Sequence, residues 1–281
     1  MNRNRPPLAV ALTVAGSDSG GGAGIQADLR AFTAFGVFGT AALAAVTAQN
    51  PRGVTGIAAV PVETVRQQLS AVLEAFTVGA VKTGMLFSAD IIRAVATELG
   101  ARPGLPVVVD PVMIATSGAK LLHDDAVACL CADLLPRAFL VTPNLPETEA
   151  LTGRSLRTPA EIRAAAMELA GRCGCRVLVK GGHGVLTPGE DILCDGAGFW
   201  TFRTPAVANP ASTHGTGCSL SAAIAANLAL GRDLPDAVRH AKAYVYGALR
   251  NARPVGPGTF AMWPAKRLPL DAVEMTRNGA P

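Results

Sequence analysis

Short apolar runs alternate with longer amphipathic segments along almost the whole chain. A short apolar run predicts a strand, and apolar residues spaced three and four apart predict a helix. The expected strands cover residues 8–15, 40–48, 53–60, 80–83, 107–110, 139–142, 176–180, 191–194 and 199–203. The expected helices cover residues 24–35, 62–76, 89–100, 125–135, 146–152, 159–172, 219–230 and 236–251. The alternation predicts an α/β fold with a mainly parallel central sheet and helices on both faces. The closely spaced runs at residues 191–203 add a small antiparallel edge.

The even spread of this pattern over 281 residues predicts one domain covering residues 1–281. Hydrophobic residues make up 49% of the chain and charged residues 16%, a composition that is typical of a compact, well-buried protein. We expect residues 1–7 to form a flexible N-terminus and residues 265–281 to form a loosely ordered tail.

Composition and charge argue against two classes of partner, nucleic acids and membranes. Aromatic residues are 5% of the chain and the net charge is only +4, from scattered arginines, so no nucleic-acid surface is expected. No apolar run is long enough to span a bilayer, so no membrane partner is expected. Residues 8–15 follow two arginines, as in a secretion signal, but we favour a first strand because cleavage would remove the partner of the glycine turn at 20–22. Six cysteines without a disulfide framework favour a cytoplasmic protein.

The segment from Thr213 to Cys218 carries the clearest chemistry. It is rich in glycine and leads directly into an alanine-rich helix. Free N–H groups and the positive end of the helix dipole make such a loop an anion site. The same field favours the thiolate of Cys218. Gly215, Thr216, Gly217 and Cys218 are therefore candidate catalytic residues for transfer of a phosphoryl group to an alcohol.

Further polar residues follow the ends of expected strands, where ligands gather in parallel sheets. Lys180 precedes two glycines and is a candidate phosphate ligand. Asn144 and Glu147 fit either a helix capping box or a site that orders Mg²⁺ and its water. Asp110 either ends its strand or contacts the metal shell. His214, beside the anion loop, is expected to make a structural hydrogen bond.

Residues 22–27 superficially match the dinucleotide fingerprint G-x-G-x-x-A. That fingerprint expects an acidic residue about twenty positions later, yet none occurs between Asp28 and Glu63. A nicotinamide site is therefore disfavoured. A tight helix-packing turn and a substrate-facing loop, with Asp28 accepting a hydrogen bond, remain open. The chain has no Walker-type phosphate loop.

Six segments together resemble the hydroxymethylpyrimidine/phosphomethylpyrimidine kinases of thiamine biosynthesis. They are residues 15–28, 46–50, 81–86, 109–113, 179–183 and 214–218. The resemblance implies a ribokinase-like fold, a homodimer, and transfer of the ATP γ-phosphate first to the hydroxymethyl group of the pyrimidine and then to the resulting monophosphate. Thr116 stands where many relatives have lysine, which puts the details of lid closure in doubt.

The resemblance also assigns roles by position. The pyrimidine pocket would be lined by Gly16, Asp28, Gln49, Met85 and Val112. The anion hole would run from Gly215 to Cys218, with Cys218 as the base. The phosphates and Mg²⁺ would be served by Asn144, Glu147 and Lys180, with Asp110 at the metal shell. The alternatives are a pyridoxine/pyridoxal kinase, which shares the fold and a ring-hydroxymethyl substrate, and, more distantly, a nicotinamide-dependent oxidoreductase.

Overall fold

The computed structural model describes residues 6–113, 124–181, 185–208 and 210–279. One sheet is built from β1 (Val10–Asp18), β2 (Phe38–Asn50), β3 (Gly53–Ala59), β4 (Val78–Thr83), β5 (Val107–Val109), β6 (Leu140–Val141), β7 (Arg176–Gly181), β8 (Glu190–Cys194), β9 (Phe199–Arg203) and β12 (Glu274–Asn278). A separate hairpin is formed by β10 (Arg253–Gly256) and β11 (Thr259–Ala261). The helices are α1 (Gly24–Ala34), α2 (Val62–Ala75), α3 (Ala89–Gly100), α4 (Asp124–Cys129), α5 (Leu145–Thr152), α6 (Pro159–Cys173), α7 (Thr216–Ala229) and α8 (Leu234–Arg250).

The strand order is β12-β9-β8-β7-β6-β5-β4-β1-β2-β3. All neighbours from β2 through β7 pair in parallel, whereas β3, β8, β9 and β12 are antiparallel to the strands they join. The predicted mainly parallel α/β fold is confirmed, and the antiparallel edge expected at residues 191–203 corresponds to β8 and β9. Because β2 follows β1 on one side and β4 lies on the other, the chain reverses direction of winding at β1, which is where α/β sheets open a crevice for ligands.

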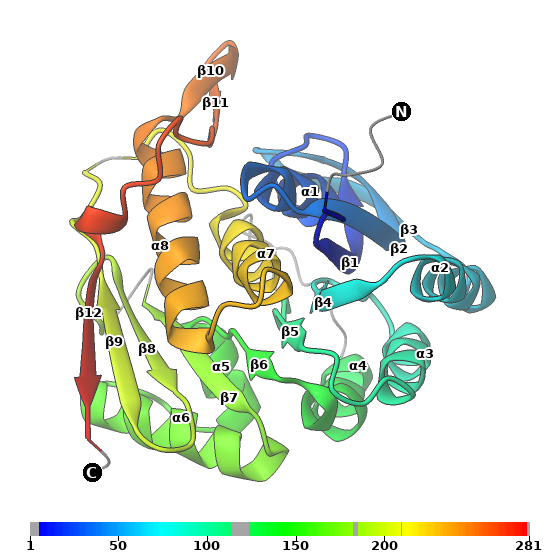
Figure 1. Cartoon of the computed structure of the whole chain (residues 1–281), viewed down its shortest axis with the longest axis horizontal. Helices are drawn as coiled ribbons and strands as arrows, with labels where there is room; N and C mark the ends of the chain where they lie inside the picture. Colours follow the sequence, from blue (N-terminus) through cyan, green and yellow to red (C-terminus); the bar gives the residue numbers. More distant parts are fainter. Residues whose placement is uncertain (1–5, 114–123, 182–184, 209, 280–281) are drawn as a thin grey trace.

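Helices cover both faces of the sheet (Figure 1). One buried cluster joins the sheet to α1, α7 and α8, and a second joins it to α2, α3, α4, α5 and α6. The core is made mainly of valine, leucine, isoleucine and alanine, apolar residues whose burial favours folding. The middle strands are apolar on both faces, which explains why their sequence shows continuous apolar runs instead of alternation.

Several element boundaries differ from the sequence prediction. The run expected to form a strand at 8–15 forms β1 at Val10–Asp18. The helix expected at 125–135 is α4 followed by a π-helical turn, Leu130–Leu134, and a 3₁₀ turn, Leu135–Arg137. Pro136 explains the change, because it lacks the N–H that a longer α-helix would need.

The C-terminal tail also differs from the expectation of loose order at residues 265–281. Glu274–Asn278 forms β12, which pairs antiparallel with β9 at the edge of the sheet. The side-chain amide of Asn278 donates to Thr201 Oγ1 at 3.0 Å, and the guanidinium of Arg277 lies 5.3 Å from the centre of the Trp200 ring. Cross-strand pairing therefore orders this segment although its side chains are exposed.

Among the described residues, no helix combines the length and apolar character that crossing a lipid bilayer requires.

Candidate functional site

The N-terminus of α7 begins three residues earlier than expected. Gly215 is its N-cap and adopts a left-handed conformation (φ 81°), and Thr216 is the first helical residue. Gly217 and Cys218 therefore lie inside the first turn. Within the described part of the chain their backbone N–H groups have no acceptor, whereas Ser219 N donates to Gly215 O at 2.9 Å. Two free amides at a helix N-terminus form the cradle for an anion that the sequence predicted.

A lysine and an aspartate from two strand ends lie beside this cradle. Lys180, in β7, places Nζ 2.7 Å from Oδ1 of Asp110, the residue that follows β5. Ser221 Oγ, on α7, lies 3.1 Å from Asp110 Oδ2. A Cβ built on Gly217 would lie 3.3 Å from Lys180 Nζ, so the ammonium is adjacent to the first turn of α7. The predicted phosphate ligand and the predicted anion hole therefore meet.

Neighbouring charges keep Lys180 and Asp110 ionised, whereas burial favours the neutral form of each group. Burial would raise the pKa of Asp110, but Lys180 and Lys82 hold that pKa below its ordinary value. Burial would lower the pKa of Lys180, but the carboxylates of Asp110 and Glu147 raise it. Both groups are thus ionised at neutral pH.

Glu147 and Asn144 form the capping box of α5. The amide of Glu147 donates to Asn144 Oδ1 and the amide of Asn144 donates to Glu147 Oε2, each at 2.8 Å. The carboxyl of Glu147 also lies 3.9 Å from Lys180 Nζ. Burial raises the pKa of Glu147 to about 7. The capping interpretation is thus observed, and the same carboxyl lies near Lys180, the predicted phosphate ligand.

A second buried ion pair involves a lysine that the sequence analysis did not single out. Lys82, in β4, places Nζ 2.8 Å from Asp28 Oδ2, and both side chains are 0% exposed. Thr13 Oγ1 donates to the same oxygen at 2.6 Å. Burial raises the pKa of Asp28, and Asp28 and Cys218 are among the groups that raise the pKa of Lys82 against its own burial. A single lysine inside an apolar strand was the signal available in the sequence.

Cys218 lies between the two ion pairs. Burial raises the pKa of its thiol to about 11, with Asp28 and Asp110 adding to the rise. Lys82 and the backbone amide of Gly24 act in the opposite direction. The expectation that the helix field leaves a thiolate is therefore wrong for the protein without substrates: at neutral pH the sulfur keeps its proton, because desolvation outweighs the helix field.

The residues expected to line the pyrimidine pocket are distributed around the ends of β1, β2, β4 and β5. Gly16 and Met85 touch: Gly16 N donates to Met85 O at 3.1 Å, and a Cβ on Gly16 would lie 2.6 Å from Met85 Cε. Gln49 is half-buried at the end of β2, where its backbone bonds to Ser19 Oγ. Val112 is half-buried and follows Asp110. Asp28 differs from the others, because it has no exposed surface and faces Lys82.

Register shifts mark two of these positions. The pairing of β1 with β2 shifts between Ala15 and Gly16, and that of β2 with β3 shifts between Ala48 and Gln49. Such irregularities bend a strand and redirect side chains, and they are common beside active sites.

Asp18 occupies the amides that a dinucleotide would need. Its carboxylate accepts hydrogen bonds from the backbone N–H groups of Gly20, Gly22 and Ala23 at 2.8–3.0 Å. His214 Nε2 lies 2.9 Å from the same carboxylate, which is the structural hydrogen bond expected for this histidine. With these donors already paired, the glycine loop before α1 offers no pyrophosphate cradle.

Metal-binding side chains are sparse in the described residues, where no group of three or more His, Cys, Asp or Glu is arranged to hold a metal ion. Asp110 and Glu147, the two carboxylates expected at the metal, both lie near Lys180 Nζ. Thr116 lies outside the described residues.

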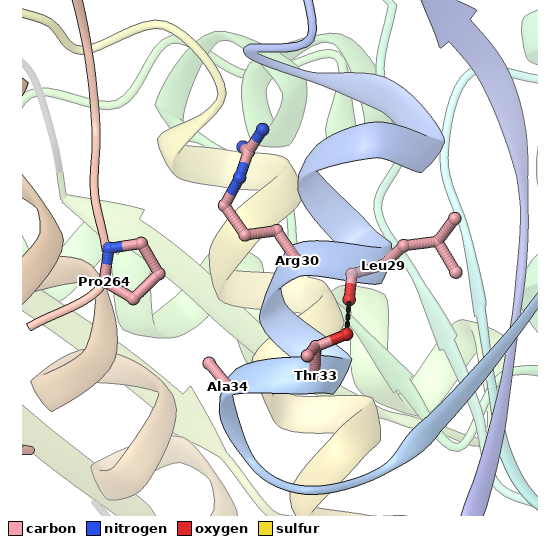
Figure 2. Close-up of a pocket in the computed structure, with 5 residues that line it drawn as sticks. All are labelled: Leu29, Arg30, Thr33, Ala34 and Pro264. Carbon is pink, nitrogen blue, oxygen red and sulfur yellow. Dashed lines mark hydrogen bonds between the residues drawn. The ribbon is translucent and has the colours of Figure 1, made fainter. Parts of the chain in front are cut away.

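Figure 2 shows a hollow between α1 and the segment that carries Pro264, lined by Leu29, Arg30, Thr33, Ala34 and Pro264. Its volume is about 390 Å³. None of the predicted site residues lines it. Arg30 reaches back from this helix to donate to Gly21 O at 3.0 Å. The hollow therefore borders a residue that supports the glycine loop, and it is separate from the predicted site residues.

Comparison with known proteins identifies the family. The phosphomethylpyrimidine kinase family matches residues 18–263. The chain belongs to this family. It is 45% identical over 252 residues to the hydroxymethylpyrimidine/phosphomethylpyrimidine kinase of Bacillus subtilis, covering 88% of this chain and 92% of that protein. It is 50% identical over 259 residues to the thiamine biosynthesis bifunctional protein ThiED of Geobacter sulfurreducens, of which it spans 52%. The resemblance found in the sequence is confirmed.

Solved structures give the same fold. Pyridoxal kinase from Staphylococcus aureus in complex with ADP matches with a TM-score of 0.83 at 30% identity, over 97% of this chain and all of that one. Phosphomethylpyrimidine kinase from Clostridium difficile matches with a TM-score of 0.77 at 37% identity, over 85% of this chain and 99% of that one. The expected ribokinase-like architecture is confirmed.

Proposed function

We propose that this protein is an ATP-dependent kinase that phosphorylates 4-amino-5-hydroxymethyl-2-methylpyrimidine and then phosphorylates the monophosphate to the diphosphate, in thiamine biosynthesis. The observation that carries the proposal is the meeting of three features at one sheet edge in a chain of this family: the free amides of Gly217 and Cys218, the ammonium of Lys180, and the Cys218 thiol.

The phosphate donor is ATP with Mg²⁺. Lys180 and the α7 amides would hold the γ-phosphate oxygens, which carry the charge of the transferring group. Asp110 and Glu147 fit Mg²⁺, because this ion takes few carboxylates and keeps several waters and phosphate oxygens as ligands. Bound Mg²⁺ would neutralise charge on the phosphates. Asn144 would support this region through the capping box that fixes Glu147.

In the transfer step the hydroxyl oxygen of the acceptor bonds to the γ-phosphorus while the bond from phosphorus to the bridging oxygen of ADP breaks. The Cys218 thiol first releases its proton to water, and the thiolate Sγ then accepts the hydroxyl proton. Positioning and charge neutralisation supply most of the acceleration in such reactions, so the small fraction of Cys218 that is thiolate at neutral pH is sufficient. Lys82 favours the thiolate electrostatically.

The acceptor ring would lie between Gly16 and Met85 on one side and Val112 on the other, with Gln49 reading its amino and nitrogen edge. Asp28 supports this pocket from below, and its Oδ1 is buried without a hydrogen-bond partner among the described residues. We infer that a ring substituent or a bound water meets this oxygen, since an unpaired buried carboxylate oxygen is costly.

The decisive experiment measures ADP release with ATP, Mg²⁺ and the hydroxymethylpyrimidine, followed by the mass of the products. Two successive gains of one phosphoryl group are expected. Pyridoxal is the parallel substrate, because the Staphylococcus aureus pyridoxal kinase has the same fold. Faster turnover of pyridoxal than of the pyrimidine would instead assign the protein as a pyridoxal kinase. Binding of both ligands without ADP release would remove the kinase assignment.

Two substitutions test the roles within the site. Cys218→Ala should lower kcat by about a hundredfold or more, the range for loss of a general base, and leave ATP binding intact. The control is Cys194→Ala, which removes a buried thiol of β8 far from α7. Gln49→Ala should raise KM for the pyrimidine and leave KM for ATP unchanged.

We further propose that the enzyme is a cytoplasmic homodimer. Its six cysteines are all free, as a reducing compartment requires, and the outer β2–β3 ribbon leaves apolar side chains uncovered.

A further inference from the structure

Asp18 is the centre of a hydrogen-bond network that the transfer chemistry does not use. It is 2% exposed, yet it touches none of the groups assigned to phosphate or metal. One oxygen accepts from Gly20 N at 2.8 Å. The other accepts from Gly22 N at 3.0 Å, Ala23 N at 2.8 Å and His214 Nε2 at 2.9 Å. One carboxylate therefore holds the loop before α1 and the loop before α7 at once.

The two loops also fit each other sterically. A Cβ at Gly215 would overlap Gly22 O, and a Cβ at Gly22 would overlap the ring of His214. Gly215 needs its left-handed backbone to start α7, so neither loop can shift without moving the other. The hydrogen bond from His214 to Asp18 fixes the register of this contact.

The alignment of the two loops also determines the surroundings of Cys218 Sγ, because each loop leads to a group beside it. Gly24, which begins α1 directly after the loop held by Asp18, offers its amide to Cys218. His214 precedes Gly215 and the free amides of Gly217 and Cys218. A displacement of the two loops would move the sulfur away from the Gly24 amide and would turn the anion cradle relative to Lys180.

We infer that Asp18 and His214 are a positioning pair, which holds the acceptor-side loop and the anion loop in register for phosphoryl transfer. The inference rests on the proposed kinase function. Neither residue contacts the reacting atoms; they act through the loops. Because the cradle stabilises charge as the phosphoryl group migrates, its misplacement affects the transition state more than the binding of ATP.

The first part of the test compares three variants with the wild type. His214→Leu removes the donor to Asp18, whereas His214→Gln keeps an N–H at nearly the same reach. The matched control is His240→Leu on α8, because His240 Nδ1 bonds the backbone oxygen of Asp236 at 2.9 Å, lies 3.4 Å from the carboxylate of the same residue and is equally exposed at 14%. All three are assayed with ATP, Mg²⁺ and the hydroxymethylpyrimidine, beside thermal unfolding.

His214→Leu should lower kcat by about tenfold or more, as misplacements of about 1 Å do, with KM for ATP within about twofold. His214→Gln should recover most of kcat, and His240→Leu should leave it unchanged. The effects of Asp18→Asn and His214→Leu should not add in the double variant, because both substitutions act on the contact between these two side chains. A merely structural role would lower Tm in both leucine variants and leave kcat alone.

Hydrogen exchange provides a readout that does not depend on activity. His214→Leu should speed exchange of the amides at residues 22–24, which lie on the other loop, and His240→Leu should not. An inactive wild type would overturn the kinase assignment and leave this exchange result to decide the pair. An active wild type with kcat of His214→Leu within twofold, or with unchanged exchange at 22–24, would overturn the positioning pair alone.

Discussion

Lys82 and Asp28 are oppositely charged residues with no exposed surface, which makes each dependent on the other. Lys82→Met should destabilise the protein by about 3–5 kcal/mol, because it leaves Asp28 charged and uncompensated. The double variant with Asp28→Asn should recover much of this loss. Urea unfolding measures both, and Arg154→Met is the control, since the exposed pair of Arg154 with Glu168 at 2.9 Å should contribute only about 0–1 kcal/mol. Equal losses for Lys82→Met and Arg154→Met would contradict this account.

Glu147 gives a pH-dependent prediction at the same scale. Burial raises its pKa to about 7 from an ordinary value of 4.5, so folding favours the protonated acid. The stability it contributes is fully present below about pH 4.5 and is lost as the pH rises through about 7. Glu147→Gln keeps an acceptor for the capping box and removes the buried charge. Its Tm should therefore exceed that of the wild type at pH 8 and match it near pH 4.5, while kcat falls because the carboxylate is lost.

Glu161→Gln is the control for this behaviour. Glu161 holds the same capping-box position at the start of α6, but hydrogen bonds from the amides of Arg157 and Thr158 lower its pKa at the surface. Glu161→Gln should therefore not raise Tm at pH 8. A gain in Tm for both variants would assign the effect to capping. A gain for neither would show that the buried charge of Glu147 does not destabilise the protein.

Strand-end residues could be predicted from the sequence because parallel strands bring their carboxyl ends to one edge, as Asp110 and Lys180 show. Lys82 and Asp18 were not singled out, because Lys82 lies inside a strand instead of after its end, and because the contact of Asp18 with His214 joins two loops 196 residues apart. The Cys218 thiol was misjudged for a related reason: the helix dipole can be read from sequence, whereas the depth of burial that opposes it cannot.

Helix α7 provides the test at the scale of elements, because glycines with nearly the same left-handed backbone flank it. Gly215 (φ 81°) is its N-cap, and Gly231 (φ 80°) lies just after it. Gly231→Ala meets open space and should cost only the backbone strain, about 1–2 kcal/mol. Gly215→Ala adds an overlap with Gly22 O, so it should lower Tm further and lower kcat by about tenfold or more. Similar Tm and kcat for the two variants would contradict the interlock between the loops.

Elements with a strong periodic pattern were predicted close to their observed bounds, as for α3 and α6. The elements whose bounds were predicted wrongly depend on contacts that the local sequence does not show. β12 is polar and exposed, and it is a strand only because β9 offers an edge to pair with. The start of α7 was predicted three residues too late, because Gly217 disfavours a helix locally. In the structure the N-cap is Gly215, whose position is fixed by its packing against Gly22.

At the scale of the whole molecule, the sheet has an outer ribbon that the protomer does not cover. β3 is exposed along most of its length, and it pairs with the outer part of β2 (Figure 1). Val46 is 49% exposed and lies opposite the exposed Ala58 in this ribbon. Edge strands of this kind are usually protected by charge, by a bulge or by another chain. The ribbon has a register shift near Gln49 but apolar side chains, which favours protection by a second copy.

Val46→Glu should therefore convert the proposed dimer to a monomer, because it places a charge in an apolar interface with no partner. Light scattering during size-exclusion chromatography measures the mass directly over a range of concentrations. Met167→Glu is the matched control, since Met167 on α6 is 48% exposed and lies at the opposite end of the sheet. A dimer that survives Val46→Glu and dissociates with Met167→Glu would place the interface on α6. A wild type that is monomeric at all concentrations would remove the dimer and leave the proposed phosphoryl-transfer site unchanged, because Lys180, Asp110 and the first turn of α7 come from one chain.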